Sequence, residues 1–219
     1  MNPRARELVL EVVEQRYPRA LAAFLAGSHA AGTATRTSDI DLVVIHAGPA
    51  HRDTIRHGSQ LVEVFAHSRA SLWEFVDRET ELRRSPLLHM CATGVLVRDR
   101  DAVGAGIQAQ AVRRFAAGPP PLSDHERDDA RYAVTDLLDD LDGARDPGEA
   151  VFVSARLLVE VARLALARDR QWLGNGKWLW RRLHAHDPAL AETLRTDPRT
   201  GAVEVLGRVG GSLRDGYRR

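Results

Sequence analysis

The chain has 219 residues, 44% of them hydrophobic, which is enough for one large or two small domains with buried cores. Its formal net charge of +1 argues against a nucleic-acid partner, because nucleic-acid-binding domains usually carry a strongly basic surface. Cys91 is the only cysteine, which excludes a disulfide framework or a cysteine-rich zinc site and predicts a reducing, cytoplasmic location. Residues 1–19 have no long apolar core, so we expect no signal peptide or membrane span there.

The first predicted elements are a helix and a buried strand. Residues 4–16 place apolar side chains at helical spacing, which predicts an amphipathic helix closed by Pro18. Residues 21–26 are a continuous apolar run that ends at Gly27 and Ser28, so we expect a strand followed by a turn.

Two acids stand at the start of the next predicted strand. Asp39 and Asp41 lead into residues 42–45, an apolar and mostly β-branched run. Side chains alternate along a strand, so both acids leave on the same face. Carboxylates this close repel each other, and a cation normally compensates them. Magnesium takes oxygen ligands and keeps positions free for substrate phosphates, so we predict a magnesium site at Asp39 and Asp41.

The rest of the first half predicts a small mixed sheet with helices on it. In chain order we expect a short exposed or helical connection at 52–57, a strand at 60–66, a helix at 68–82 capped by Ser68 or Ser71, a short helix at 87–92 and a strand at 94–97. The charged residues 98–101 are expected to form a solvated turn.

A family resemblance rests on the Gly27-Ser28 turn, a gap of ten residues, Asp39-Ile40-Asp41 and the apolar strand that follows. This pattern resembles the signature of the DNA polymerase beta-like nucleotidyltransferase superfamily. Over roughly residues 15–100, the chain is most similar to the bacterial aminoglycoside adenylyltransferases and minimal nucleotidyltransferases. The resemblance implies that Gly27 and Ser28, with Ser38 beside them, bind a nucleoside triphosphate. A turn with close backbone approach and a helix beginning near Ser28 suits a phosphate. The alternative is that the two acids only cap or solvate the sheet edge.

Glu63 lies in the predicted strand 60–66, between Val62 and Val64. The superfamily often places a third acid on the strand next to the paired acids, and Glu63 matches that position by order and context. The resemblance leaves two roles open, a third metal ligand or the general base that accepts a proton from an acceptor hydroxyl. The alternative is a solvent-facing Glu on a half-exposed strand.

The second half of the chain has a helical pattern. Residues 118–122 include three consecutive prolines and predict a stiff linker, so we expect a nucleotidyltransferase domain at 1–117 and a helical domain at 123–219. Ser123 is the predicted cap of a helix that runs to about Leu141 and is rich in aspartate. This acidic helix could receive a polycationic acceptor such as an aminoglycoside, but a solvated outer face is the favoured explanation.

A second long helix is predicted at 149–167, apolar almost all round. Arg156 and Glu160 are four residues apart and are expected to pair. Lys177 follows a Gly-Asn-Gly turn and stands among Trp172, Trp178 and Trp180. Related nucleotidyltransferases often bring a lysine from the helical domain onto the triphosphate, so the resemblance assigns this role to Lys177. The alternative is a surface lysine beside core tryptophans.

The sequence therefore predicts an α/β (α+β) nucleotidyltransferase domain with a small mixed sheet, followed by an all-α helical bundle. The expected activity is magnesium-dependent transfer of a nucleoside monophosphate, AMP from ATP, to a hydroxyl of a small-molecule acceptor such as an aminoglycoside-type antibiotic, with release of pyrophosphate. Two alternatives remain: a protein AMP-transferring, antitoxin-like enzyme, and a non-catalytic nucleotide-binding protein. Neither a nucleic acid nor a membrane is expected as a partner.

Overall fold

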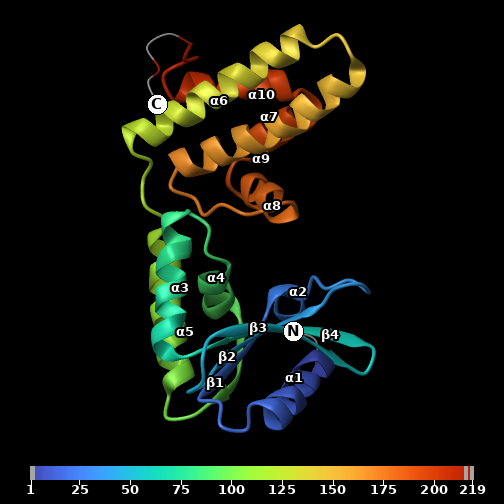
Figure 1. Cartoon of the computed structure of the whole chain (residues 1–219), viewed down its shortest axis with the longest axis vertical. Helices are drawn as coiled ribbons and strands as arrows, with labels where there is room; N and C mark the ends of the chain where they lie inside the picture. Colours follow the sequence, from blue (N-terminus) through green and yellow to red (C-terminus); the bar gives the residue numbers. More distant parts are fainter. Residues whose placement is uncertain (1–2, 215–216, 218–219) are drawn as a thin grey trace. The chain divides into compact units, whose positions relative to one another are not determined.

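The computed structural model describes residues 3–214 and residue 217. The chain forms two compact units, Met1–Ala117 and Gly118–Arg219, called here the sheet unit and the helical unit (Figure 1). Residues 118–123 join them and contain neither helix nor strand.

The sheet unit contains a mixed sheet with the strand order β3-β4-β2-β1-β5. Its five strands are β1 (Ala22–Ala26), β2 (Ile40–Ile45), β3 (His51–His57), β4 (Gln60–His67) and β5 (Val95–Asp99). β2 and β4 run parallel, and the other neighbouring strands run antiparallel.

Helices cover both faces of this sheet. They are α1 (Pro3–Arg16), the short α2 (Gly27–Ala31), α3 (Arg69–Glu81), α4 (Pro86–Thr93) and α5 (Val103–Ala117). α1 packs Val9 and Val12 against one face, where Leu25 and Leu42 belong to the same core. α3, α4 and α5 lie on the opposite side of the sheet (Figure 1). The second face, carrying Asp41, is therefore the one enclosed by α3 and α4.

Most of the predicted elements are confirmed within a few residues at either end. They are the helices at 4–16, 68–82 and 87–92 and the strands at 21–26, 42–45, 60–66 and 94–97. The α3 cap is reciprocal, because Ser68 and Ser71 each accept a hydrogen bond from the other's backbone amide.

The prediction for residues 52–57 was wrong. These residues form β3, an edge strand joined to β4 by a tight turn at Gly58 and Ser59. Ile55 is the only buried side chain of β3, so the strand lacks the apolar alternation that marks a strand in sequence. The strand is stabilised by pairing with β4 and not by the intrinsic preference of its own residues.

The expectation of a merely solvated turn at residues 98–101 also needs correction. The Asp99 carboxylate accepts hydrogen bonds from the amides of Gly104 (2.7 Å) and Ala105 (3.1 Å), so it caps α5 from the end of β5. α5 itself was not predicted, since glycines near its start weaken the helical signal. Gly104 packs closely there, because a Cβ would lie 2.5 Å from Leu96 Cδ1 and 3.0 Å from the Cβ of Ala22 and would force the leucine side chain to shift.

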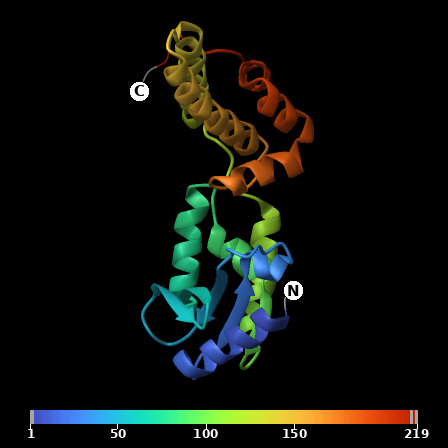
Figure 2. The same ribbon diagram turned by 90° about the vertical axis from the view of Figure 1, so that its right-hand side faces the viewer.

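The helical unit contains α6 (Asp124–Gly143), α7 (Pro147–Arg168), α8 (Lys177–His186), α9 (Pro188–Thr196) and α10 (Pro198–Arg208). α6 and α7 lie side by side (Figures 1 and 2). Buried residues of α7, such as Leu157 and Val161, form the centre of the core. The predicted Arg156–Glu160 pair is confirmed at 2.7 Å.

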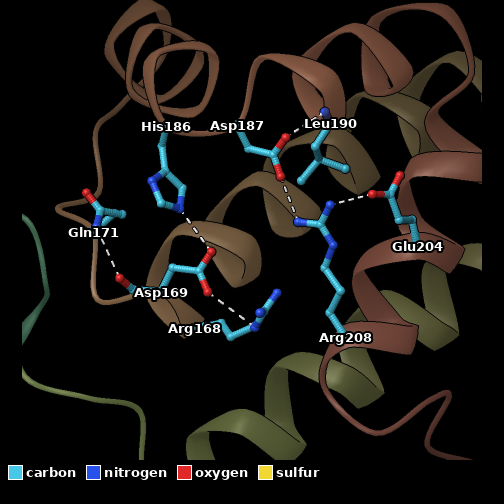
Figure 3. Close-up of polar contacts among 8 residues, drawn as sticks. All are labelled: Arg168, Asp169, Gln171, His186, Asp187, Leu190, Glu204 and Arg208. Atoms are coloured by element: carbon cyan, nitrogen blue, oxygen red, sulfur yellow. Dashed lines mark hydrogen bonds and ion pairs between the residues drawn. The ribbon is translucent and has the colours of Figure 1, made fainter.

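Charged side chains of the helical unit are tied together at the junction of α8 and α9 (Figure 3). Asp187 accepts a hydrogen bond from the Leu190 amide at 2.9 Å, which caps α9, and another from Arg208 at 2.7 Å. Arg208 also pairs with Glu204 on its own helix. Nearby, Asp169 lies 2.9 Å from the Nε2 atom of His186. These pairs join the ends of α7, α8, α9 and α10.

Among the described residues, no helix combines the length and the apolar character needed to cross a bilayer.

Candidate active site

Asp41 and Glu63 are direct neighbours across the two parallel strands. The register of β2 and β4 pairs Asp41 with Glu63, so both side chains leave the same face of the sheet. Asp39 is exposed and directly precedes β2. Its charge and that of Glu63 both act on Asp41, which shows that the structure brings the three predicted acids into one neighbourhood.

The Asp41 carboxyl group is pressed against Gly27. A Cβ at residue 27 would lie 1.8 Å from Asp41 Oδ2, and the backbone of Gly27 has a φ of +63°, so both space and conformation require glycine here. Burial, then the charges of Glu63 and Asp39, raise the pKa of Asp41 to about 6, against the weaker opposite effects of His29 and Arg52. The nearby positive charges are therefore too weak to offset burial and the two acids.

The loop that carries Asp39 is held by its backbone. The Ser38 carbonyl accepts hydrogen bonds from Gln60 Nε2 at 2.7 Å and from His29 Nε2 at 3.3 Å. A carbonyl only accepts, so Nε2 of His29 carries the proton. The Ser38 hydroxyl is engaged with Thr35, accepting from its amide at 2.9 Å. Sequence reasoning missed His29 and Gln60, since their only signal is closeness to the acids in the fold.

Arg52 was also missed, because residues 52–57 were not expected to be a strand. Its guanidinium group pairs with the Glu63 carboxylate, with Nε 3.0 Å from Oε1. The Cζ atom of the same group lies 5.0 Å from the centre of the Phe65 ring. Glu63 is thus neither a solvent-facing side chain nor an unpaired one.

The donor set fits magnesium in one respect and not in another. Asp39 and Asp41 offer the hard oxygen ligands that Mg²⁺ prefers, and the ion usually needs only one or two carboxylates when phosphates and waters complete its shell. Within residues 3–214 and 217, no three or more His, Cys, Asp or Glu side chains converge on a metal position. Glu63 as third ligand therefore stays a prediction, while the two aspartates fit the ion.

The predicted phosphate turn is the start of α2. Ser28 is its second residue, and no side chain caps the helix, which leaves its first amides free of a side-chain acceptor. Lys177 is exposed and is the first residue of α8 in the helical unit. The description of its neighbours as core tryptophans needs correction: Trp172 is 5% exposed, whereas Trp178 and Trp180 are 36% and 41% exposed.

Residues 6–87 match the family model described as the nucleotidyltransferase domain. The matched segment runs from α1 to the start of α4, and it contains Gly27, both aspartates and Glu63. The fold of the sheet unit is accordingly the α+β nucleotidyltransferase fold. The match is to this domain in general, and the aminoglycoside adenylyltransferase group stays a prediction. No curated protein matches the sequence.

Three solved structures resemble the chain at low identity. A nucleotidyltransferase-like protein from Exiguobacterium sibiricum 255-15 is 14% identical, with 93% of this chain and 74% of that chain covered and a TM-score of 0.45. A mutant of the toxin-antitoxin MntA-HpeT is 14% identical, with 53% of this chain and 89% of that chain covered and a TM-score of 0.34. A toxin-antitoxin with AMP-PNP is 15% identical, with 51% of this chain and 87% of that chain covered and a TM-score of 0.33.

Proposed function

We propose that the protein transfers a nucleoside monophosphate, AMP from ATP, to a hydroxyl group of a small-molecule acceptor and releases pyrophosphate. The observation that supports this most is the Asp41 carboxyl group, which lies where a Cβ on Gly27 would clash with it and which has a pKa raised to about 6. A carboxyl that is costly to ionise in the fold is typical of a site that binds a cation and its phosphate ligand.

The reaction is an in-line displacement at the α-phosphorus. The acceptor oxygen forms a bond to this phosphorus, the bond to the bridging oxygen breaks, and its electron pair leaves with pyrophosphate. Magnesium, held by Asp39 and Asp41, would neutralise the charge of the phosphates. Gly27 and Ser28 hold the triphosphate at the start of α2, where backbone amides face it. Ser38 positions Asp39 through its held carbonyl, and Lys177 of the helical unit is proposed to contact the triphosphate.

Glu63 has two proposed roles that differ in the path of the proton. As general base, Glu63 takes the hydroxyl proton of the acceptor. As a metal ligand, it leaves that proton to water and would coordinate through Oε2, because both Arg52 contacts are to Oε1. A pH profile of turnover separates the two, because a Glu63→Gln variant loses the acidic limb in the first case and magnesium affinity in the second.

The acceptor class is decided by a labelling experiment. The full chain is incubated with magnesium and ATP labelled on the α-phosphate, together with panels of aminoglycosides and lincosamides and with cell lysate. A labelled small molecule is expected. Label on a protein would favour the antitoxin-like alternative, and no label anywhere, with ATP still bound, would favour a non-catalytic nucleotide-binding protein. Asp41→Asn serves as the inactive control.

A further inference from the structure

A cavity of about 210 Å³ lies in the sheet unit at the C-terminal end of β4, and its lining residue Arg52 pairs with Glu63. Its floor includes Phe65 and His67 of β4. These residues are two and four positions after Glu63 in the strand, so all three side chains leave the same face of the sheet. The walls are mostly carbon, from Phe75, Pro86, Leu87 and Met90. Pockets that enclose drug-sized ligands measure about 300–1,000 Å³, so this cavity suits one ring of a larger molecule.

His67 is a lining residue of this cavity with an unsatisfied polar atom. The residue is 5% exposed, and its Nδ1 atom is buried with no hydrogen-bond partner among the described residues. Leaving such an atom unpaired costs free energy, and because the atom is closed to solvent, a ligand recovers this cost only when the imidazole ring turns to meet it. Burial, and then the neighbouring His46 and His51, lower the pKa of His67, so the ring is neutral at pH 7. A neutral imidazole can pair with a hydroxyl group.

The other polar side chains of the lining are already engaged. His51 contacts the Pro49 carbonyl at 3.1 Å and the Tyr17 hydroxyl at 3.0 Å. Glu79 Oε2 accepts hydrogen bonds from the Ser85 hydroxyl at 3.0 Å and from the Leu87 amide at 3.2 Å. Burial raises the pKa of Glu79, and its Oε2 atom is already occupied by these two donors. Of Arg52 and Glu79, Arg52 is the more exposed, and its positive charge disfavours a cation.

Arg52 connects the cavity to the acids. It lines the cavity, lies over Phe65 and pairs with Glu63. The Cα atoms of Glu63 and His67 are four residues apart along β4, on the order of 13 Å. A molecule with its ring in the cavity and a short arm past Arg52 can thus reach the acids, and the positive Arg52 would repel a cationic arm.

The order of the strands places the cavity opposite the phosphate turn. Gly27 follows β1 on one side of Asp41, whereas the cavity lies over β4 and β3 on the other side. In an in-line displacement the attacking and leaving oxygens stand on opposite sides of the phosphorus. With the pyrophosphate on the Gly27 side, the acceptor hydroxyl arrives from the β4–β3 side.

We propose that this cavity is the acceptor subsite, and that the acceptor is an uncharged hydroxyl compound whose aromatic ring fills it and whose second polar group pairs with His67. The inference rests on the nucleotide transfer proposed above and narrows its substrate class. Phe65, Phe75 and Met90 give the ring aromatic and sulfur contacts. A polycationic aminoglycoside does not fit this chemistry.

The test uses three small probes that differ in one group each. They are 4-(2-hydroxyethyl)phenol, the cationic 4-(2-aminoethyl)phenol and 2-phenylethanol, which lacks the phenol hydroxyl. Binding to the full chain is measured by ligand-observed NMR titration. We expect the first probe to bind at least several-fold more tightly than either of the others. Equal binding of the cationic probe, or competition by kanamycin, would overturn the proposed acceptor class.

Two variants locate the binding. Ala50 is exposed at the cavity rim, and Ala50→Trp should abolish binding of the first probe by filling the entrance. Ala109 is exposed on α5 outside the lining, so Ala109→Trp is the matched control and should bind as the wild type does. His67→Phe should bring the affinities for 4-(2-hydroxyethyl)phenol and 2-phenylethanol together. Unchanged probe binding in both Ala50→Trp and His67→Phe would show that the probe does not bind in this cavity.

Calorimetric titration with magnesium and ATP separates this inference from the proposed function. Ala50→Trp should bind ATP like the wild type, because the phosphate turn lies across Asp41 from the cavity. ATP binding without probe binding would overturn the acceptor subsite alone. Probe binding without any ATP binding by the wild type would instead overturn the nucleotide transfer on which the subsite depends.

Discussion

Asp41 in the sheet unit and Asp187 in the helical unit are both partly buried aspartates, yet their pKa values shift in opposite directions. Burial and two neighbouring acids raise the pKa of Asp41 to about 6. Burial alone would also raise that of Asp187, but the Leu190 amide and the Arg208 guanidinium together lower it (Figure 3). One carboxylate is left for a ligand to compensate, and the other is compensated by the fold. The comparison separates a site residue from a structural one without reference to sequence motifs.

The same contrast extends to the acidic helix of the helical unit. Asp128 pairs with Arg131 at 2.9 Å, Asp142 with Arg199, and Asp139 with Arg214. Acids that hold their own arginines in this way offer less charge to a polycationic acceptor. This surface therefore adds little support for an aminoglycoside.

The largest expected effect is loss of transfer on removing either aspartate charge. Asp39→Asn and Asp41→Asn should each lower turnover by at least about two orders of magnitude, because each removes a ligand from the proposed metal site. Turnover with labelled ATP measures this, and circular dichroism should show an intact fold. Asp53→Asn, at an exposed aspartate of the edge strand β3, is the matched control. Retention of most activity in either test variant would rule out the metal-site assignment.

The close approach of Gly27 to Asp41 predicts a second large effect. Gly27→Ala should lower turnover by about two orders of magnitude, since the new Cβ must displace the Asp41 carboxyl group. Gly58→Ala is the control: Gly58 has a nearly equal φ of +58° but nothing within 4 Å of the added Cβ. Both variants should lose about 1–2 kcal/mol of stability from the left-handed backbone. If both also kept full activity, the packing of Asp41 against Gly27 would have no functional role.

Lys177 tests whether the helical unit contributes to the chemistry. Lys177→Ala should slow turnover by about two orders of magnitude, the scale of one lost electrostatic contact to the departing pyrophosphate. Lys177→Arg should rescue it only in part, because a planar guanidinium does not occupy the place of a compact ammonium. Arg181→Ala, an exposed cation on the same helix, should leave turnover unchanged. Wild-type turnover in Lys177→Ala would confine the site to the sheet unit.

The smallest effects concern stability against pH and have opposite signs in the two units. The folded-state pKa of Asp41 is raised, so in the absence of magnesium its ionisation lowers stability as pH rises from about 4 through 6. Asp41→Asn should remove this decline and be more stable at pH 7 by about 1–2 kcal/mol, after allowance for solvent screening. Urea unfolding at several pH values measures this, and a less stable variant at pH 7 would contradict the raised pKa.

Asp187 should behave in the reverse way. Its folded-state pKa is lowered, so its contribution is present above the ordinary aspartate pKa and disappears as pH falls through the lower folded value. Asp187→Asn keeps a good helix cap but loses the charge facing Arg208, and should cost up to about 1 kcal/mol at pH 7. The loss should shrink as pH falls below the ordinary aspartate pKa, and turnover should not change. A loss that is independent of pH would mean that the charge of Asp187 is not the stabilising feature.

The sequence by itself determined the elements that carry local signals. Ser68 and Ser123 mark the starts of α3 and α6 because their side chains satisfy helix amides a few residues away. The Gly27 turn and the paired aspartates were visible for a similar reason, since alternation along one strand already puts both acids on one face. Such signals act over a few residues, so they can be read without the fold.

The tertiary structure alone decided how distant residues meet. β3 is polar and forms only by pairing with β4, and α5 depends on Asp99 at the end of β5 and on close packing at Gly104. The raised pKa of Asp41 likewise requires Gly27 at the start of α2 and Glu63 of β4 to approach it. Desolvation and cross-strand contacts depend on burial by residues far away in the sequence, and no local pattern encodes them.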